Sequence, residues 1–183
     1  MSGNDRSHGG IPAGSGSGGI GPSPTASIQG DPEVIRLLNV AIKNELTAIN
    51  QYFLHYRMLD DWGVTILAKK EYEESIDEMK HAEALIERIL FLDGAPNMTE
   101  TLEIHVGTNV KDQLESDLKL EIDACAMYNE AVKVAREEGD DASRDLFARL
   151  LKDEEGHVDW LEAQLHQIKE MGYERYLSQQ VKE

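Results

Sequence analysis

Hydrophobic and polar residues alternate with the period of an α-helix over four long stretches of the chain. In each stretch apolar side chains recur three or four residues apart, so each predicted helix has one apolar face for a common core. The pattern stops at short glycine-containing turns and at one longer segment. We therefore predict an all-α protein with long helices at residues 32–61, 64–92, 109–138 and 142–171, and a short fifth helix at 173–180.

The predicted helix ends carry residues that favour starting or stopping a helix. Asp31 can cap the first helix with its carboxylate, and Pro32 suits the first helical position. Gly63, Gly139 and Gly172 follow the first, third and fourth helices, where glycine commonly ends the helical backbone. Local signals and hydrophobic periodicity thus predict the same boundaries.

Two short turns and one long connection determine the predicted topology. Because residues 62–63 and 139–141 leave little chain between helices, each of these turns joins two antiparallel neighbours. The connection at residues 93–108 can extend to about 50 Å, which is enough to run the length of a helix of about 45 Å. We therefore expect an up-down-down-up four-helix bundle with a long crossover between the second and third helices.

The first 30 residues differ in composition from the rest of the chain. They are rich in Gly, Ser and Pro and lack hydrophobic periodicity. Such segments cannot bury enough apolar surface to fold. We predict a disordered extension at residues 1–30, whose origin as natural sequence or fusion remnant stays open, and one folded domain at residues 31–183.

Acidic side chains outnumber basic ones, 35 against 18, which gives a formal net charge of −17. This charge repels nucleic-acid phosphates and anionic membranes, so cations are the favoured partners. No stretch approaches the roughly 18 consecutive apolar residues of a spanning helix, and residues 1–30 lack the apolar segment of a secretory signal. The single cysteine, Cys125, cannot form an internal disulfide. Together these features predict a cytoplasmic protein without nucleic-acid or membrane partners.

One short motif occurs twice, near the middle of the second and fourth predicted helices. It is a glutamate followed three residues later by a histidine, and this spacing puts both side chains on one helix face. A further glutamate lies 33 residues before each motif, because 78 − 45 and 154 − 121 both equal 33. The sequence thus contains two matched half-sites, formed by Glu45, Glu78, His81, Glu121, Glu154 and His157.

The chemistry of these residues predicts a metal site. The four glutamates fall near the midpoints of the predicted helices and interrupt apolar stripes, so their carboxylates can meet inside the bundle. Burial and mutual repulsion would disfavour four charged carboxylates, but two divalent cations would neutralise them. An oxygen-rich ligand set with one histidine per ion suits iron or manganese. A single such motif usually lies on an exposed helix face, whereas the matched set is the one that di-metal helical bundles use.

Four segments of the sequence resemble the bacterioferritins, a family of ferritin-like proteins. They are residues 45–55 (ELTAINQYFLH), 76–82 (IDEMKHA), 87–92 (ERILFL) and 153–162 (DEEGHVDWLE), and the resemblance runs from about residue 30 to the end of the chain. It implies a ferritin-like bundle with an intrasubunit ferroxidase centre that binds two iron ions per subunit. In this centre one iron would be held by Glu45 and His81, the other by Glu121 and His157, and both would be bridged by Glu78 and Glu154.

The resemblance also implies an assembly and a second cofactor. Bacterioferritins are hollow cages of 24 subunits, built from twofold dimers, that store ferric mineral and bind haem b. A ferredoxin-type reductant would then serve as a partner for releasing the stored iron. Whether the cage contains one subunit type or two stays open.

Met79 is the candidate haem ligand. It follows Glu78 by one residue, so it points about 100° away from the predicted metal face, on a stripe with Ile76 and Tyr72. Across a twofold interface two copies of Met79 could ligate one haem iron from its two sides, which would give one haem shared between two subunits. From the residues alone, ordinary interface packing is the plainer interpretation.

Several further residues have two interpretations each. By resemblance to the family, iron entry pores would contain Asp61, Asp93 and Asp159, and an inner-surface iron site would contain Asp77 and Asp153; solvated helix charge explains all five equally well. Glu73 departs from the histidine found in some family members, which puts the inner site in doubt. Tyr52 could lie near the metal centre and supply an electron, or it could be a core residue.

The predicted function is iron storage and detoxification. Fe(II) would be oxidised to Fe(III) by O₂ or peroxide at the paired site, and the ferric product would be stored as mineral. Two alternatives remain: a non-storing di-iron or di-manganese enzyme of the peroxidase or catalase type, and a structural cage subunit with an idle site. A DNA-protecting miniferritin fits poorly, because the chain is acidic and contains the whole ligand set.

Overall fold

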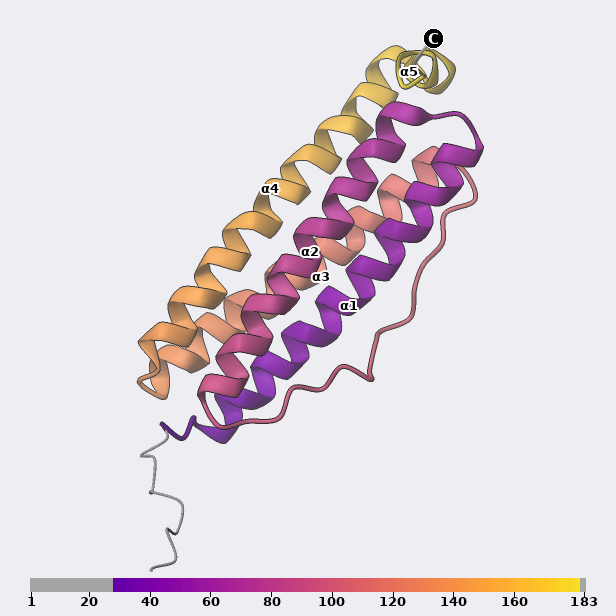
Figure 1. Ribbon diagram of the computed structural model, residues 1–183. Coiled ribbons are helices and arrows are strands. Elements are labelled where there is room, and N and C mark those ends of the chain that lie inside the picture. The colour runs from indigo at the N-terminus through magenta and orange to yellow at the C-terminus, as the bar shows by residue number, and fades with distance from the viewer. Residues whose placement is uncertain (1–27, 182–183) are drawn as a thin grey trace, which may run out of the picture.

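A computed structural model describes residues 28–181 and contains four long helices and one short one over that range (Figure 1). The helices are α1 (Pro32–Asp61), α2 (Thr65–Phe91), α3 (Val110–Glu137), α4 (Asp141–Met171) and α5 (Tyr173–Gln179). Every predicted helix is confirmed, with ends that differ by at most one residue. The small differences arise because Val64, Leu92, Asn109 and Glu138 serve as capping residues just outside the helices.

Side-chain caps begin three of the long helices. The Asp31 carboxylate accepts the N–H of Glu33 at 2.8 Å at the start of α1, as predicted. Asn109 and Asp140 cap α3 and α4 in the same way, with acceptor distances of 3.0 and 2.9 Å. These bonds satisfy N–H groups that have no partner within the helix. Gly63 and Gly139 take positive φ angles of 77° and 73° after α1 and α3, which reverses the chain into the next helix.

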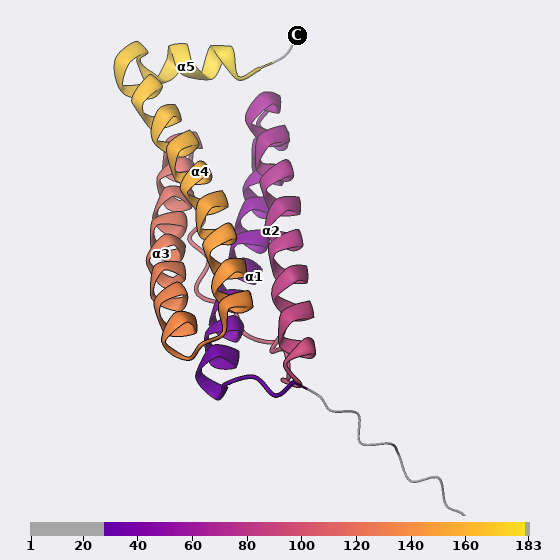
Figure 2. The ribbon, with the colours of Figure 1, turned by 90° about the vertical axis from the view of Figure 1, so that its left-hand side faces the viewer.

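The four long helices form the predicted up-down-down-up bundle. Figure 1 shows that the crossover between α2 and α3 runs along the outside of the bundle from one end to the other. Figure 2 shows α5 lying across the end where α4 finishes. A backbone bond of 2.9 Å from Ile66 N–H to the Gln180 carbonyl ties α5 to the start of α2. The fold is therefore a four-helix bundle with a short C-terminal helix, as the resemblance to ferritin-like proteins implied.

A polar stripe on α1 holds the crossover in place. The N–H groups of Leu102, His105 and Gly107 donate to α1 side chains at 2.8, 3.0 and 3.3 Å. The α1 partners of the crossover recur every four residues, so each lies about one turn above the one before it and together they form a continuous stripe along the helix: Asn39, Lys43, Thr47, Gln51 and His55. The sequence predicted the length of this connection but not the side chains that hold it.

The core consists of two apolar clusters with a polar layer between them. The cluster nearer the α3–α4 turn includes Leu38, Ile42, Leu85, Ile89, Tyr128, Phe147 and Leu150. The cluster nearer α5 includes Leu59, Leu67, Leu114, Leu161, Ile168 and Tyr176. Each cluster closes one end of the bundle, so polar groups in the middle layer are shielded from water along the bundle axis.

Among the helices described between residues 28 and 181, none combines the length and apolarity needed to cross a lipid bilayer. The predicted extension at residues 1–30 lies almost entirely outside the described residues, so the division of the chain at residue 30 stays a prediction. Gly30 itself is described, and its N–H donates to the Leu92 carbonyl at 3.0 Å.

Candidate metal centre

The polar layer contains all six residues that were singled out by their spacing. The carboxylates of Glu45, Glu78, Glu121 and Glu154 come from four different helices and are only 1–2% exposed. Their ligand atoms and those of the two histidines form two groups, in each of which all atoms lie within 4.8 Å of one another. Glu78 and Glu154 belong to both groups. We call Glu45 with His81 the first half-site, and Glu121 with His157 the second half-site.

The two shared glutamates each present one oxygen to each histidine. The Nδ1 atom of His81 lies 2.9 Å from Glu78 Oε2 and 3.2 Å from Glu154 Oε1. The Nδ1 atom of His157 lies 3.1 Å from the other oxygen of each, Glu78 Oε1 and Glu154 Oε2. The two rings are nearly parallel, with centroids 6.2 Å apart. Two carboxylates placed in this way could bridge two ions, one beside each histidine.

Several atoms of the centre have no partner despite full burial. Glu78 Oε1, both oxygens of Glu154 and His157 Nδ1 make no hydrogen bond. Buried polar atoms usually find a partner, so these need an explanation. Two ligands at right angles around an ion with bonds of about 2.1 Å lie about 3 Å apart. The Nδ1 atom of His157 lies 3.1 Å from one oxygen of Glu78 and one of Glu154, which matches that spacing. The donor set therefore fits divalent cations.

The electrostatics of the centre point the same way. Burial and the neighbouring Glu78 charge raise the pKa of Glu45 and of Glu121 well above the usual value. Burial alone would lower the pKa of His81, but its contacts with Glu154, Glu45 and Glu78 outweigh burial and raise it to about 12. Negative charge is thus concentrated in a dry interior, where protons or metal cations must balance it.

Two tyrosines hold the terminal glutamates from across the bundle. The Tyr52 hydroxyl on α1 donates to Glu121 on α3, and the Tyr128 hydroxyl on α3 donates to Glu45 on α1. The hydrogen bond confirms that Tyr52 lies near the centre; its role as an electron donor stays a prediction. Sequence reasoning missed the role of Tyr128. The signal was present, because each tyrosine follows its own helix's glutamate by seven residues.

Glu74 is a second residue that sequence reasoning missed. Its carboxylate is 3% exposed, and Glu74 Oε2 lies 2.9 Å from Nε2 of His157. The ammonium group of Lys70 contacts the other oxygen of Glu74. Glu74 precedes Glu78 by four residues and therefore shares its helix face, which is the signal that could have identified it.

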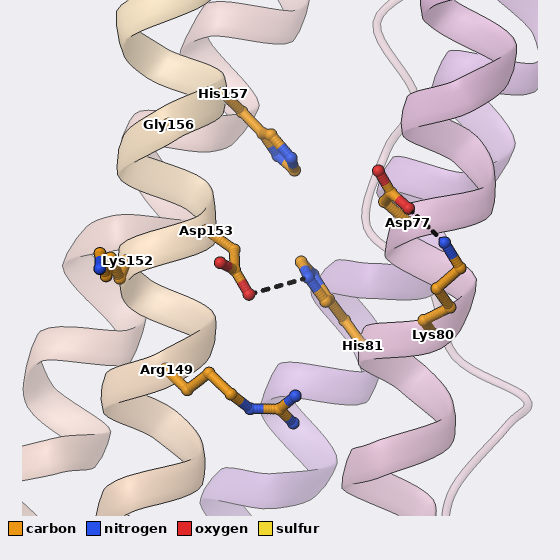
Figure 3. A pocket seen from close by; sticks show the side chains of 8 residues that line it. All are labelled: Asp77, Lys80, His81, Arg149, Lys152, Asp153, Gly156 and His157. Carbon is orange, nitrogen blue, oxygen red and sulfur yellow. Dashed lines mark hydrogen bonds and ion pairs between the residues drawn. The ribbon is translucent and has the colours of Figure 1, made fainter.

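An opening between α2 and α4 leads to the two histidines (Figure 3). The cavity measures about 450 Å³ and is lined by Asp77, Lys80, His81, Arg149, Lys152, Asp153, Gly156 and His157. Asp153 Oδ2 lies 3.7 Å from Nε2 of His81. The structure thus brings Asp77 and Asp153 to this opening, whereas Asp61, Asp93 and Asp159 are exposed and do not line it.

Met79 lies on a different face, away from this opening. It is 52% exposed and lines a mostly apolar groove of about 490 Å³ between α1 and α2. The apolar lining includes Leu46, Ile49, Ile76, Ala82 and Ile86. One of these, Ile76, had been placed with Met79 on the predicted stripe. The groove therefore has the composition expected for a face that is covered in an assembly.

Comparisons with known proteins agree with the geometry. The ferritin-like domain family matches residues 35–171. A bacterioferritin from Brucella melitensis is 53% identical over 149 residues, which is 81% of this chain and 92% of the relative. Bacterioferritins from Mycolicibacterium paratuberculosis and Rhodobacter capsulatus are each 46% identical, over 83% and 79% of this chain and 96% and 90% of the relatives. This chain belongs to the bacterioferritin family of ferritin-like proteins.

Proposed function

We propose that this protein stores iron and that its buried centre is a ferroxidase site, which oxidises Fe(II) to Fe(III). The observation that carries the proposal is the pair of ligand groups that share Glu78 and Glu154, with buried atoms that lack partners. The first half-site would bind one Fe(II) ion and the second half-site the other, and the two shared glutamates would bridge them. Family membership supports iron as the metal.

Two iron ions at one centre suit the oxidation chemically. Each Fe(II) substrate ion gives up one electron, so a pair supplies the two electrons that reduce peroxide to water or O₂ to peroxide without a one-electron radical product. Carboxylates tolerate both oxidation states of the ion because they are hard, charged oxygen ligands. The Fe(III) product would leave the centre and hydrolyse to mineral inside the assembly.

The chain's own groups would position the substrate ions. The phenols of Tyr52 and Tyr128 hold one oxygen each of Glu121 and Glu45, which leaves the second oxygen of each for an ion. The opening between α2 and α4 gives a route to both histidines. Apolar clusters at both ends of the bundle exclude water along its axis. Contacts within the protein thus hold these side chains in position, and such contacts are what preorganise a metal site.

The remaining parts of the proposal concern the assembly. We propose a cage of 24 subunits built from twofold dimers, located in the cytoplasm, with haem b held between two copies of Met79. The exposed thioether and its apolar groove fit such a group, which would supply electron transfer for release of stored iron. A ferredoxin-type reductant would be the partner in that release. Whether a second subunit type joins the cage is left to measurement.

The ferroxidase proposal is tested by stopped-flow oxidation of Fe(II). Replacing Glu78 by Gln removes the charge of a bridging ligand to both ions, so we expect the rapid phase to slow more than about 100-fold. Glu73→Gln, an exposed change on the same helix, is the matched control and should leave the rate unchanged. An unaltered rapid phase in Glu78→Gln would refute the centre, and a particle mass far below 24 × 20.5 kDa would refute the cage.

The haem assignment has its own test. Protein loaded with haem should lose the absorption bands of bis-methionine ligation when Met79 is replaced by Leu, because leucine has no atom that ligates iron. Met98, which also lines the groove, provides the control Met98→Leu. Identical spectra for Met79→Leu and the unchanged protein would show that Met79 is not the ligand.

A further inference from the structure

A second group of buried ligand-type side chains lies outside the ferroxidase centre. His55 on α1, Glu71 on α2 and Asp117 on α3 have potential ligand atoms that all lie within 4.8 Å of one another. All three side chains are buried, with exposures of 0%, 1% and 0%. None of them was a candidate from the sequence, because no short motif connects residues this far apart.

This group lies nearer the α5 end of the bundle than the ferroxidase centre. His55 follows Glu45 by ten residues along α1, Glu71 precedes Glu78 by seven along α2, and Asp117 precedes Glu121 by four along α3. Helix α1 runs towards α5, whereas α2 and α3 run away from it (Figure 1). A later position on α1 and earlier positions on α2 and α3 therefore all lie closer to α5. At 1.5 Å per residue these displacements amount to about 6–15 Å, so the two groups are separate.

The contacts of the group leave one buried atom without a partner. Asp117 accepts from Gln51 Nε2 at 2.8 Å and lies 3.0 Å from Nδ1 of His55. Glu71 Oε2, by contrast, has no hydrogen-bond partner. Lys70 is the adjacent basic residue, but its ammonium group contacts Glu74. A buried carboxylate oxygen of Glu71 therefore faces a second carboxylate and an imidazole without any bond of its own.

We propose that His55, Glu71 and Asp117 form a third cation site, which binds one divalent metal ion per chain. Two carboxylates and one neutral imidazole balance the charge of one such ion, and this ligand set suits Fe(II), Mn(II) or Zn(II). Gln51 would not touch the ion, but its hydrogen bond would orient Asp117, as the hydrogen-bond partners of metal ligands commonly do. The site does not rest on the proposed ferroxidase function, since none of its ligands belongs to that centre.

Binding at this site has a consequence for the crossover. The Gly107 N–H donates to Nε2 of His55 at 3.3 Å, which requires the imidazole proton to sit on Nδ1. An ion bound at Nδ1 would displace that proton, and the imidazole would then be protonated at Nε2. Two N–H donors, those of His55 Nε2 and Gly107, would face each other, so the hydrogen bond would be lost. The last contact between the crossover and the α1 stripe would then open, so amide exchange at Gly107 should speed up when the ion binds.

The test uses Zn(II) added to the metal-free, full-length assembly, with ions located by anomalous diffraction at the zinc edge. We expect a peak between the three side chains in the unchanged protein and none in Glu71→Gln or Asp117→Asn. Glu73→Gln is the control and should keep the peak, as should Glu78→Gln, which disturbs only the ferroxidase centre. Circular dichroism and particle mass verify that the variants fold and assemble.

Three results would overturn the proposal. One is the absence of an anomalous peak between the three side chains in the unchanged protein, whether or not an ordered water occupies that position. Another is a peak of undiminished height in both Glu71→Gln and Asp117→Asn. The third is unaltered exchange at Gly107 with the ion bound, which would remove His55 from the ligand set. If Glu78→Gln loses metal at the ferroxidase centre but keeps the anomalous peak between His55, Glu71 and Asp117, the two sites bind metal independently.

Discussion

The first and second half-sites of the centre have matching ligands in different surroundings. In each, a glutamate and a histidine meet the shared pair Glu78 and Glu154, and a tyrosine from the opposite helix holds the terminal glutamate. Beyond these ligands the resemblance ends. The Nε2 atom of His81 faces the half-exposed Asp153 at the opening, whereas that of His157 faces the buried Glu74.

The tyrosines show the same contrast. Tyr128, which holds the first half-site, lies in the apolar cluster with its ring centroid 6.2 Å from that of Phe147. Tyr52, which holds the second, is buried beside further carboxylates, and its pKa is raised by burial and then by the charges of Glu121 and Asp117. Equal ligand sets can therefore give unequal ion affinities. We expect the second half-site to bind a cation more tightly, because more buried negative charge surrounds it.

The largest expected difference comes from removing one histidine at a time. His81→Ala should lose the ion of the first half-site and keep the other, and His157→Ala should do the reverse, because in the proposed centre each imidazole would bind one ion. Iron analysis of anaerobically loaded protein should find about half the content of the unchanged centre in each variant. His166→Ala, an exposed histidine on α4, is the control. Two ions retained at the centre in either variant would contradict the ligand assignment.

The next effect tests the environment of the second half-site. Glu74→Gln removes the charge facing His157, so we expect the affinity of that half-site to fall about 10- to 100-fold while the first half-site changes little. Competition titration with a chromophoric chelator measures the cation affinities of both half-sites. Lys70→Gln removes a positive charge instead and should not weaken binding. Equal weakening of both half-sites would show that the surroundings do not distinguish them.

The smallest expected effect concerns the two tyrosines in metal-free protein. Tyr128→Phe leaves a buried oxygen of Glu45 without its hydrogen-bond donor, beside the apolar cluster that contains residue 128, which should lower the free energy of unfolding by about 1–3 kcal/mol. Tyr52→Phe should lower the free energy of unfolding by less, since other polar groups lie near the Glu121 carboxylate. Chemical denaturation compares them, with Tyr56→Phe as a partly buried control. A larger loss for Tyr52→Phe would reverse the proposed contrast.

Much of the fold could be predicted because it depends on local patterns. Helical periodicity, the Asp31 cap and the glycines at positions 63 and 139 concern residues within a turn or two of one another, and the structure confirms them. The six residues of the centre were also accessible, since equal spacing on helices of similar length puts them at similar heights. What the sequence determined by itself was therefore the set of helices, their order and the level at which the acidic groups meet.

The tertiary structure alone decided which side chains face each other across the bundle. Tyr128 meets Glu45 across 83 residues of sequence, and Gln51 meets Asp117 across 66. Such pairs depend on the rotation and height of whole helices, and a shift of one residue turns a side chain by about 100°. The unequal surroundings of the two half-sites, the α1 stripe under the crossover and the group around Glu71 follow from that placement, because burial and pairing are properties of neighbours in space.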